Sequence, residues 1–285
     1  MPDEIPPRTI VDSSGFAFQL AVERSVSAAA SPFTVLTTEH AWKHPRTHDS
    51  GFADMVLEDT KGTRLVVECK RARGGRWIFL RPDEHGALPR RRFAPTAAQK
   101  SEQVIVHWTA MEPDRNAIGT DAVFFHPPSP YSAFCIPQGF SEGQKPMLER
   151  LAAELVLATE AIAYEQYQLD AAHRATDMGR MWAYVPVIVT TTPLTVCDFN
   201  PAEIDIGTGL LPENATFTDV GVIRFVKNLS DEGADARGHR TLDSLNTAKD
   251  RTVFVVNSKA FGEFLRTLEW VRGTPEGLKP FMGLR

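Results

Sequence analysis

The chain has 285 residues and a formal net charge of −5, and 42% of its residues are apolar while 24% are charged. This composition is ordinary for globular proteins and excludes a disordered chain, a collagen-like repeat and a coiled coil. No run approaches the roughly 18 uninterrupted apolar residues of a membrane-spanning helix, and the first residues do not show a signal-peptide pattern. We therefore expect a folded cytoplasmic protein that does not bind a membrane.

Neither the cysteines nor the histidines form a strong metal-site pattern. The three cysteines are far apart and never in a CxxC spacing, which indicates reduced thiols rather than disulfides or a zinc site. His40, His44 and His48 recur at every fourth residue, and on a helix this spacing would align three zinc ligands. Pro45 breaks any helix there, so a polar loop is the favoured interpretation.

The first expected elements are a helix over residues 14–30 and a strand over 33–42. In the helix, Phe18, Val22 and Val26 recur at helical spacing. The strand segment is rich in β-branched and aromatic residues.

A β-hairpin is expected next. Two short apolar runs, 52–58 and 64–71, lie on either side of the polar segment 59–62, which ends in glycine. Such a segment is typical of a tight turn in which the glycine adopts a positive φ.

Further helices and strands are expected downstream. Thr96 and Gln99 form a capping-box pattern that predicts the start of another helix. An apolar stripe predicts a long amphipathic helix over 141–174, and the runs 187–191 and 194–198 predict a second hairpin. The remaining expected elements are strands at 122–125, 132–136, 222–226 and 252–256, a loop over 231–250 and a closing helix over 259–271.

The order of these elements predicts the fold class. A run of αβββα followed by further strands and helices is typical of an α/β protein with a central mixed β-sheet flanked by helices. The character of the chain changes near 138–144. We therefore expect an N-terminal core over 1–140 and C-terminal α/β additions over 141–285 that pack on the same sheet or complete it.

Three charged residues gather at one end of the expected hairpin. Asp54 lies in its first strand, and Glu68 and Lys70 end its second strand. Side chains alternate along a strand, so Glu68 and Lys70 share one face, Cys69 points to the other, and the turn brings Asp54 alongside. Burying such charges among apolar neighbours costs several kcal/mol each unless they are paired or hold a metal.

This group of residues suits phosphoryl chemistry. Two carboxylates are the hard oxygen ligands that Mg²⁺ takes together with water and substrate phosphate. A lysine beside the metal can orient or deprotonate a water, or stabilise charge on the phosphoryl oxygens.

The Asp54 and Glu68-Cys69-Lys70 spacing, with a helix and an apolar strand before it, resembles the PD-(D/E)XK nuclease superfamily, which has the restriction-endonuclease-like fold. The resemblance covers residues 14–71, and 187–191 match a downstream core strand more weakly. It departs from the family motif at Ala53, where the proline would stand.

The resemblance implies hydrolysis of DNA phosphodiester bonds with Mg²⁺, or Mn²⁺ as a substitute, leaving a 5′-phosphate. Asp54 and Glu68 would bind the metal, and Lys70 would assist the attacking water. Glu23 stands at the position of a metal-associated glutamate on the first helix, although a solvated helix carboxylate is an equal interpretation. Gln99 and, one turn later, Gln103 would contact phosphate, but capping accounts for Gln99 equally well.

A basic stretch follows the last of these residues. Eight basic and two acidic residues lie between Lys70 and Arg92, a local charge of +6 that leaves −11 for the rest of the chain. Arginine forks match phosphate oxygens and give salt-dependent affinity for nucleic acid. The alternative is a mobile basic loop. The expected nucleic-acid contacts are Arg71, Arg73, Arg76, Arg90, Arg91 and Arg92.

Other interpretations stay open. A short acid-x-Lys triplet arises by chance, and Asp59-Thr60-Lys61 also matches it, in a polar turn. The ordinary interpretation of Glu68 and Lys70 is an ion pair that closes a sheet edge.

The function has alternatives too. One is a catalytically inactive nucleic-acid-binding or assembly module on the same fold, and another is a metal hydrolase of a small phosphoester, although the long arginine-rich tract favours a polymer. DNA over RNA, and a role in restriction, defence or repair, rest on family analogy alone. A homodimer is expected because double-strand cutting often needs two active sites.

Overall fold

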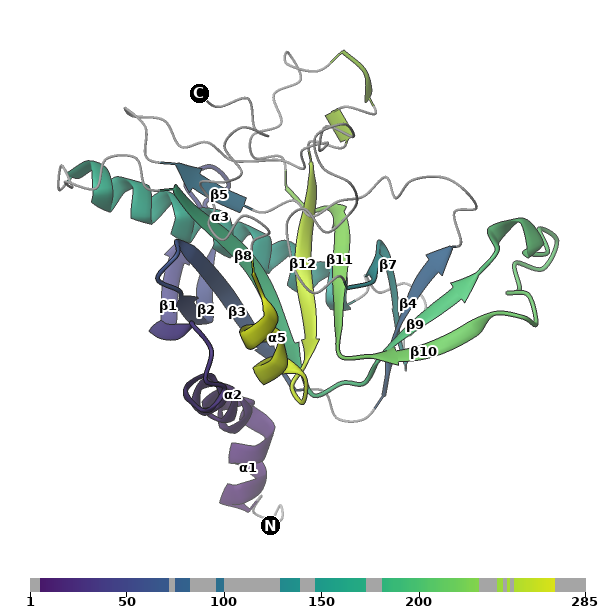
Figure 1. The fold of residues 1–285 in the computed structure, drawn as a ribbon, viewed down its shortest axis with the longest axis horizontal. Helices are drawn as coiled ribbons and strands as arrows, with labels where there is room; N and C mark the ends of the chain where they lie inside the picture. The colour runs from purple at the N-terminus through teal and green to yellow at the C-terminus, as the bar shows by residue number, and fades with distance from the viewer. Residues whose placement is uncertain are drawn as a thin grey trace, which may run out of the picture.

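The computed structural model describes residues 6–71, 75–82, 96–99, 129–138, 147–172, 181–230, 240–242, 245–246 and 249–269. These residues form an α/β protein with two mixed β-sheets and with helices on both faces of the larger sheet (Figure 1). None of the helices in these ranges combines the length and apolar character needed to cross a membrane.

The larger sheet has the strand order β1-β2-β3-β8-β12-β11-β6, and β5 pairs with β8 beside this path. Strands β3, β8 and β12 run parallel to one another, whereas β1, β2 and β3 are antiparallel neighbours. The strands are β1 (Thr34–Lys43), β2 (Ser50–Glu58), β3 (Thr63–Lys70), β5 (Thr96–Gln99), β6 (Tyr131–Ser132), β8 (Met181–Thr190), β11 (Val222–Asn228) and β12 (Asp250–Asn257).

The smaller sheet has the order β10-β9-β4-β7. Strands β9 and β10 extend into an arm that projects from the body, at the right of Figure 1. The strands are β4 (Trp77–Pro82), β7 (Phe134–Pro137), β9 (Leu194–Phe199) and β10 (Thr216–Val220), and the short 3₁₀ turn Pro201–Glu203 follows β9.

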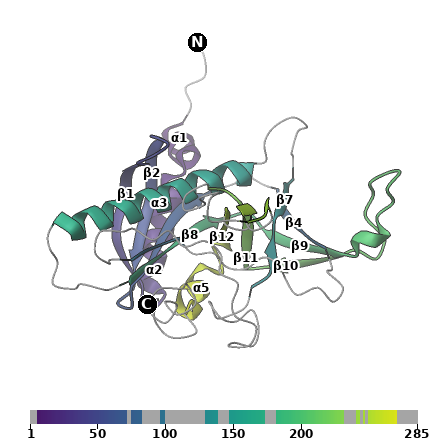
Figure 2. The ribbon, with the colours of Figure 1, turned by 90° about the horizontal axis from the view of Figure 1, so that it is seen from above.

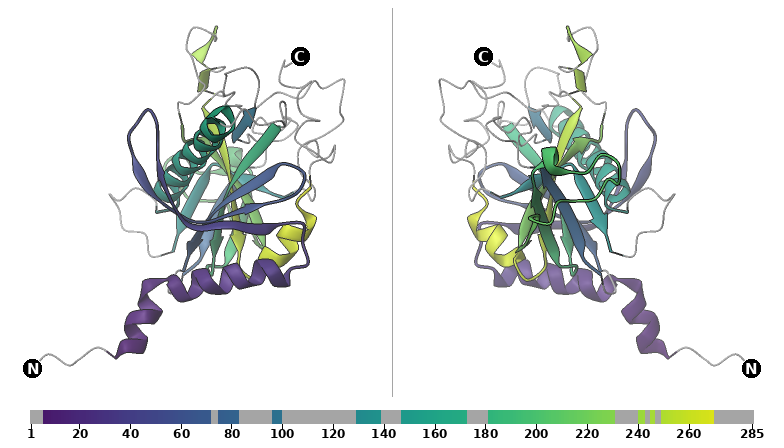
Figure 3. Two further views of the ribbon diagram at one scale, coloured as in Figure 1. Left: turned by 90° about the vertical axis from the view of Figure 1, so that its left-hand side faces the viewer. Right: turned by 90° about the vertical axis from the view of Figure 1, so that its right-hand side faces the viewer.

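Helices cover both faces of the larger sheet. Helix α3 (Met147–Ala172) crosses one face (Figure 2), and α2 (Phe16–Ala28) and α5 (Phe261–Thr267) pack against the other. Helix α1 (Pro7–Ser14) precedes α2 at an angle and projects away from the sheet (Figure 3).

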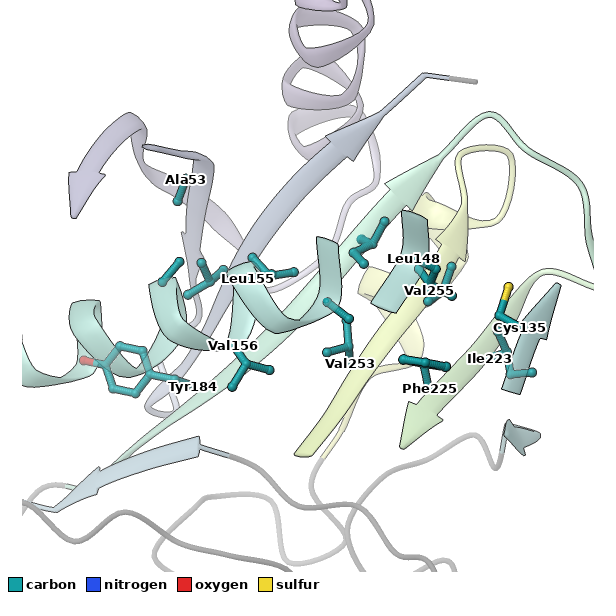
Figure 4. Packing of buried hydrophobic residues seen from close by; sticks show 14 of the residues in the cluster. Ala53, Cys135, Leu148, Leu155, Val156, Tyr184, Ile223, Phe225, Val253 and Val255 are labelled. Atoms are coloured by element: carbon teal, nitrogen blue, oxygen red, sulfur yellow. The ribbon is translucent and has the colours of Figure 1, made fainter. Parts of the chain in front are cut away.

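The core therefore has two layers. On one face, α3 contributes Leu148, Leu155 and Val156, which pack toward strand residues such as Tyr184 and Val253 (Figure 4). On the other face, side chains of α2 and α5 pack on the opposite sides of β2, β3, β8 and β12. Central strands covered on both faces bury their side chains along most of their length, which explains the continuous apolar runs in their sequences.

Several predicted elements are confirmed. The first helix, the strand after it, the first hairpin, the long helix and the closing helix correspond to α2, β1, β2–β3, α3 and α5. At the hairpin tip, Asp59 Oδ1 accepts hydrogen bonds from the backbone N–H groups of Lys61, at 2.9 Å, and Thr63, at 2.7 Å. Gly62 there has a φ of 104°, as the turn requires.

The second hairpin was predicted wrongly. Strands β8 and β9 follow each other around Pro193 but lie in different sheets. Both edges of β8 are occupied, by β3 and β12, so β9 pairs with β4 and β10 instead. The run 132–136 is likewise divided between the two sheets, in β6 and β7.

The helix expected to begin at Thr96 was also wrong, because residues 96–99 form β5 and pair antiparallel with β8. Pairing with a neighbouring strand supplies hydrogen bonds that a local capping pattern does not reveal. Three other elements were missed: α1, which begins with Pro7 at its first position, β4, inside the basic stretch, and β10, on the projecting arm. The segments expected at 122–125 and most of 231–250 lie outside the described residues.

The central position of β3 predicts the stability of a core variant. Leu65 is 0% exposed, and Leu65→Ala should lower the free energy of unfolding by about 2–5 kcal/mol, because the cavity left behind is only partly refilled. Leu36 on β1 is 50% exposed, so Leu36→Ala should change the free energy of unfolding by less than about 0.5 kcal/mol. Urea denaturation of both variants measures the difference, and equal losses would contradict this packing.

Candidate functional site

A cavity of about 280 Å³ lies where the β2–β3 hairpin meets the junction between α1 and α2. The hairpin contributes Asp54, Glu68 and Lys70 to its wall, and the helices contribute Gly15 and Gln19. The cavity lies beside the carboxyl end of β3, which runs parallel to β8 and ends level with it. In open α/β sheets, ligands bind at this edge.

Strand register aligns three acidic residues across the sheet. Thr38 pairs with Met55 and His40 with Ala53, which places Glu39 opposite Asp54. Met55 and Val67 are the last pair between β2 and β3, and Asp54 and Glu68 are the residues directly beyond that pair. Neighbouring strands therefore bring one carboxylate each to the same row.

Asp54 is held in place by the neighbouring strand. Its Oδ2 accepts a hydrogen bond from the backbone N–H of Cys69 at 2.6 Å. Burial raises the pKa of Asp54 and Glu39 adds to the rise, while the Cys69 hydrogen bond and Lys70 act in the opposite direction. The net rise means that the ionised carboxylate lacks full compensation from the protein.

Glu68 shows the same deficit more strongly. Burial, and then the charges of Asp54 and Glu154, raise the pKa of Glu68 to about 8, despite the opposing effect of Lys70. Glu154, on α3, acts on Glu68 through its charge and was not anticipated from the sequence. A carboxylate in this environment is stabilised by an added positive charge.

Lys70 lies close enough to lower the proton affinity of both carboxyl groups. Across the described part of the chain, its ammonium forms no salt bridge within 4.0 Å. Thr190 Oγ1 donates a hydrogen bond to the Lys70 carbonyl at 2.8 Å and fixes the strand end. Because β3 lies between β2 and β8, the alternative of an ion pair closing a sheet edge is disfavoured.

The donor set fits one hard divalent cation. Asp54 and Glu68 are oxygen ligands whose raised pKa values show a shortage of positive charge, and Mg²⁺ commonly binds through one or two carboxylates and several waters. Within the ranges the structure describes, no three His, Cys, Asp or Glu side chains come close enough to share one ion. The protein would thus supply these two carboxylates and leave the remaining positions to water and substrate.

Glu23 does not join this site. It lines a separate cavity of about 730 Å³ between α2 and β1, whereas Gln19, one turn earlier, lines the cavity of Asp54 and Glu68. The two positions share a helix face, so periodicity could not choose between them. Gln19 lines this cavity because the end of the hairpin lies against the first turn of α2, and only the tertiary structure brings these two segments together.

The predicted nucleic-acid contacts separate into four groups. Arg71 lines the cavity, and its guanidinium donates to the Asp12 carbonyl of α1. Arg76 is instead paired with Asp219 in the smaller sheet. Gln99 lies in β5, not on a helix. The residues Arg73, Arg90, Arg91, Arg92 and Gln103 lie outside the described residues.

The three spaced histidines do not form a common site. His40 Nε2 lies 2.7 Å from Glu165, and His44 Nε2 lies 3.5 Å from Glu160, both on α3. His48 follows in the loop after β1. Contacts with α3 thus account for the first two rings.

Comparison of the chain with models of known protein families, with curated proteins and with solved structures finds no match. The arrangement of the cavity is therefore the basis for assigning a function.

Glu68 predicts how stability depends on pH. Its folded-state pKa of about 8 lies above the ordinary value of 4.5, so the folded state holds a proton that the unfolded state releases between these values. Without divalent cations, the free energy of unfolding should therefore fall as the pH rises from 5 to 8. The fall should be steeper than in Glu68→Gln by up to ~1 kcal/mol per pH unit. Urea denaturation at several pH values measures this slope, and parallel profiles would contradict the assignment.

Cation binding should distinguish Asp54 on β2 from Glu23 on α2, both of which the sequence analysis proposed as metal ligands. Asp54→Asn should weaken Mn²⁺ binding at least about 100-fold, since it removes a ligand charge. Glu23→Gln should leave binding unchanged because Glu23 lines the other cavity. Calorimetric titration at pH 8.5 makes the comparison, and a loss of affinity in Glu23→Gln would restore Glu23 to the site.

Proposed function

We propose that this protein is a metal-dependent nuclease of the PD-(D/E)XK type that hydrolyses phosphodiester bonds of DNA. The observation that carries the proposal is that Asp54, Glu68 and Lys70 line one cavity. These are the three residues to which the motif assigns the metal ligands and the catalytic lysine. Binding alone does not need two facing carboxylates beside a lysine without an ion-pair partner at this site.

The order of elements around the cavity supports a restriction-endonuclease-like core. Helix α2 precedes the antiparallel strands β1, β2 and β3, then α3 covers one face, and β8 returns parallel to β3. Apart from β4 to β7, which lie between β3 and α3 in the sequence, this order supports the αβββα core with a further core strand that the resemblance implies. The remaining strands, β12, β11 and β6, extend the sheet on the far side of β8.

The residues of the chain have distinct parts in the proposed reaction. Asp54 and Glu68 would hold the Mg²⁺ ion, which supplies Lewis-acid activation of the phosphoryl group and of the attacking water. Lys70 can accept a hydrogen bond from that water only as a neutral amine. As an ammonium it instead donates to a phosphoryl oxygen and stabilises the developing charge.

Groups that favour anions lie at one part of the cavity wall. Arg71 lines the wall, and the first turn of α2 begins there, at Gly15 and Phe16. Backbone N–H groups at a helix N-terminus favour anions. These groups give the backbone of a nucleic acid a place beside the two carboxylates, and DNA rather than RNA is the substrate we propose by family analogy.

Substitution of Lys70 tests the reaction directly. Lys70→Ala should slow Mg²⁺-dependent cleavage of labelled DNA about 10²- to 10⁴-fold, and Glu68→Ala or a chelator should abolish it. Lys61→Ala is the matched control, because Lys61 belongs to the other acid-x-Lys triplet, at the tip of the hairpin, and should cleave like the unaltered protein.

The other outcomes separate the rival functions. Binding of DNA without cleavage under Mg²⁺ and Mn²⁺ would favour the inactive binding module. Hydrolysis of nucleotides but not of polymers would favour a small-phosphoester hydrolase. Cleavage that survives both substitutions would place the reaction elsewhere in the molecule.

A further inference from the structure

Glu39 has an unusual backbone for a residue inside a strand. Its φ is 50°, in the left-handed region that is costly for a side chain with a Cβ. Among the described residues, Ala30 and His48 are the other non-glycine positions with positive φ, and both lie outside strands, whereas Glu39 lies within β1. Strain of this kind persists only where the surrounding structure holds it, and it is concentrated at functional sites.

A buried amide holds the Glu39 side chain in place. Gln19 is 8% exposed, and its Nε2 donates to Glu39 Oε1 and also, at 3.1 Å, to the Asp54 carbonyl oxygen. Gln19 lines the proposed metal cavity, and Glu39 stands opposite Asp54 in the sheet. One side chain from α2 thus fixes the distance between the β1 carboxylate and the strand that carries Asp54.

We propose that Glu39 is a positioning residue that strengthens cation binding by Asp54 and Glu68 through its charge, without being a ligand itself. This inference rests on the proposed metal site. It agrees with the absence of any three-ligand cluster within the described ranges.

The electrostatics of the site support this role. Glu39 disfavours ionisation of both Asp54 and Glu68, and therefore contributes to the raised pKa of each. When a cation binds between Asp54 and Glu68, the negative charge of Glu39 attracts that cation and so favours its binding. The Gln19 hydrogen bonds keep that charge near the site although the Glu39 side chain is exposed to solvent.

Two substitutions of Glu39 separate charge from structure. Glu39→Gln removes the charge and keeps the length, and should raise the dissociation constant for Mn²⁺ about 5- to 20-fold by calorimetry. Glu39→Asn removes the charge and also suits the left-handed backbone, so it should weaken Mn²⁺ binding similarly without lowering the urea midpoint. A purely structural role predicts the opposite combination, with loss of stability and unchanged affinity.

Cleavage adds a second readout. For Glu39→Gln, the Mg²⁺ concentration that gives half-maximal cleavage should rise by the same factor, and saturating Mg²⁺ should restore the rate, as for loss of uniform binding. Glu213→Gln, on the projecting arm, is the control because it changes the net charge equally at an exposed site.

Each remaining outcome overturns a specific claim. Equal Mn²⁺ affinity in the unaltered protein and in Glu39→Gln would overturn the role of Glu39 alone. A loss as large as that in Asp54→Asn would make Glu39 a ligand, contrary to the proposal. Failure of the unaltered protein to bind Mn²⁺ would overturn both this inference and the proposed function.

Discussion

Desolvation of two half-buried carboxylates, to which repulsion between them adds, is the constraint on which the site depends. Asp54 and Glu68 face each other across neighbouring strands, and both hold their protons more tightly than free carboxyl groups do. Lys70 is too distant to form a direct ion pair with either of them, so it offsets only part of the cost. A divalent cation relieves this repulsion, which couples the stability of the strand ends to metal binding.

The surrounding fold holds these groups at a fixed spacing. The apolar side chains of β3 are buried under helices on both faces, and β8 anchors the strand end through Thr190. Gln19 then connects α2 to β1 and β2. Rigid strands rather than loops therefore carry the acidic groups, as a site that must position a metal and a water requires.

The arginines of the basic stretch contact different parts of the molecule. Arg71 remains beside the cavity, but Arg76 and Arg81 pair with Asp219 and Asp198 in the smaller sheet. Composition predicted one basic surface after Lys70. It could not reveal these partners, because they lie more than a hundred residues away along the chain and meet the arginines only through strand pairing.

Local patterns in the sequence determined the elements that carry the site. The helix, the hairpin with its Asp59–Gly62 tip and the juxtaposition of Asp54, Glu68 and Lys70 follow from periodicities of 3.6 and 2 residues and from turn chemistry, all of which act over short distances. Tertiary structure alone decided that β8 and β9 separate into two sheets, that Gln19 rather than Glu23 reaches the cavity, and that Glu39 joins the acidic row. Those outcomes depend on which strand edges remain open and on where a helix meets a sheet, and contacts between distant segments set both.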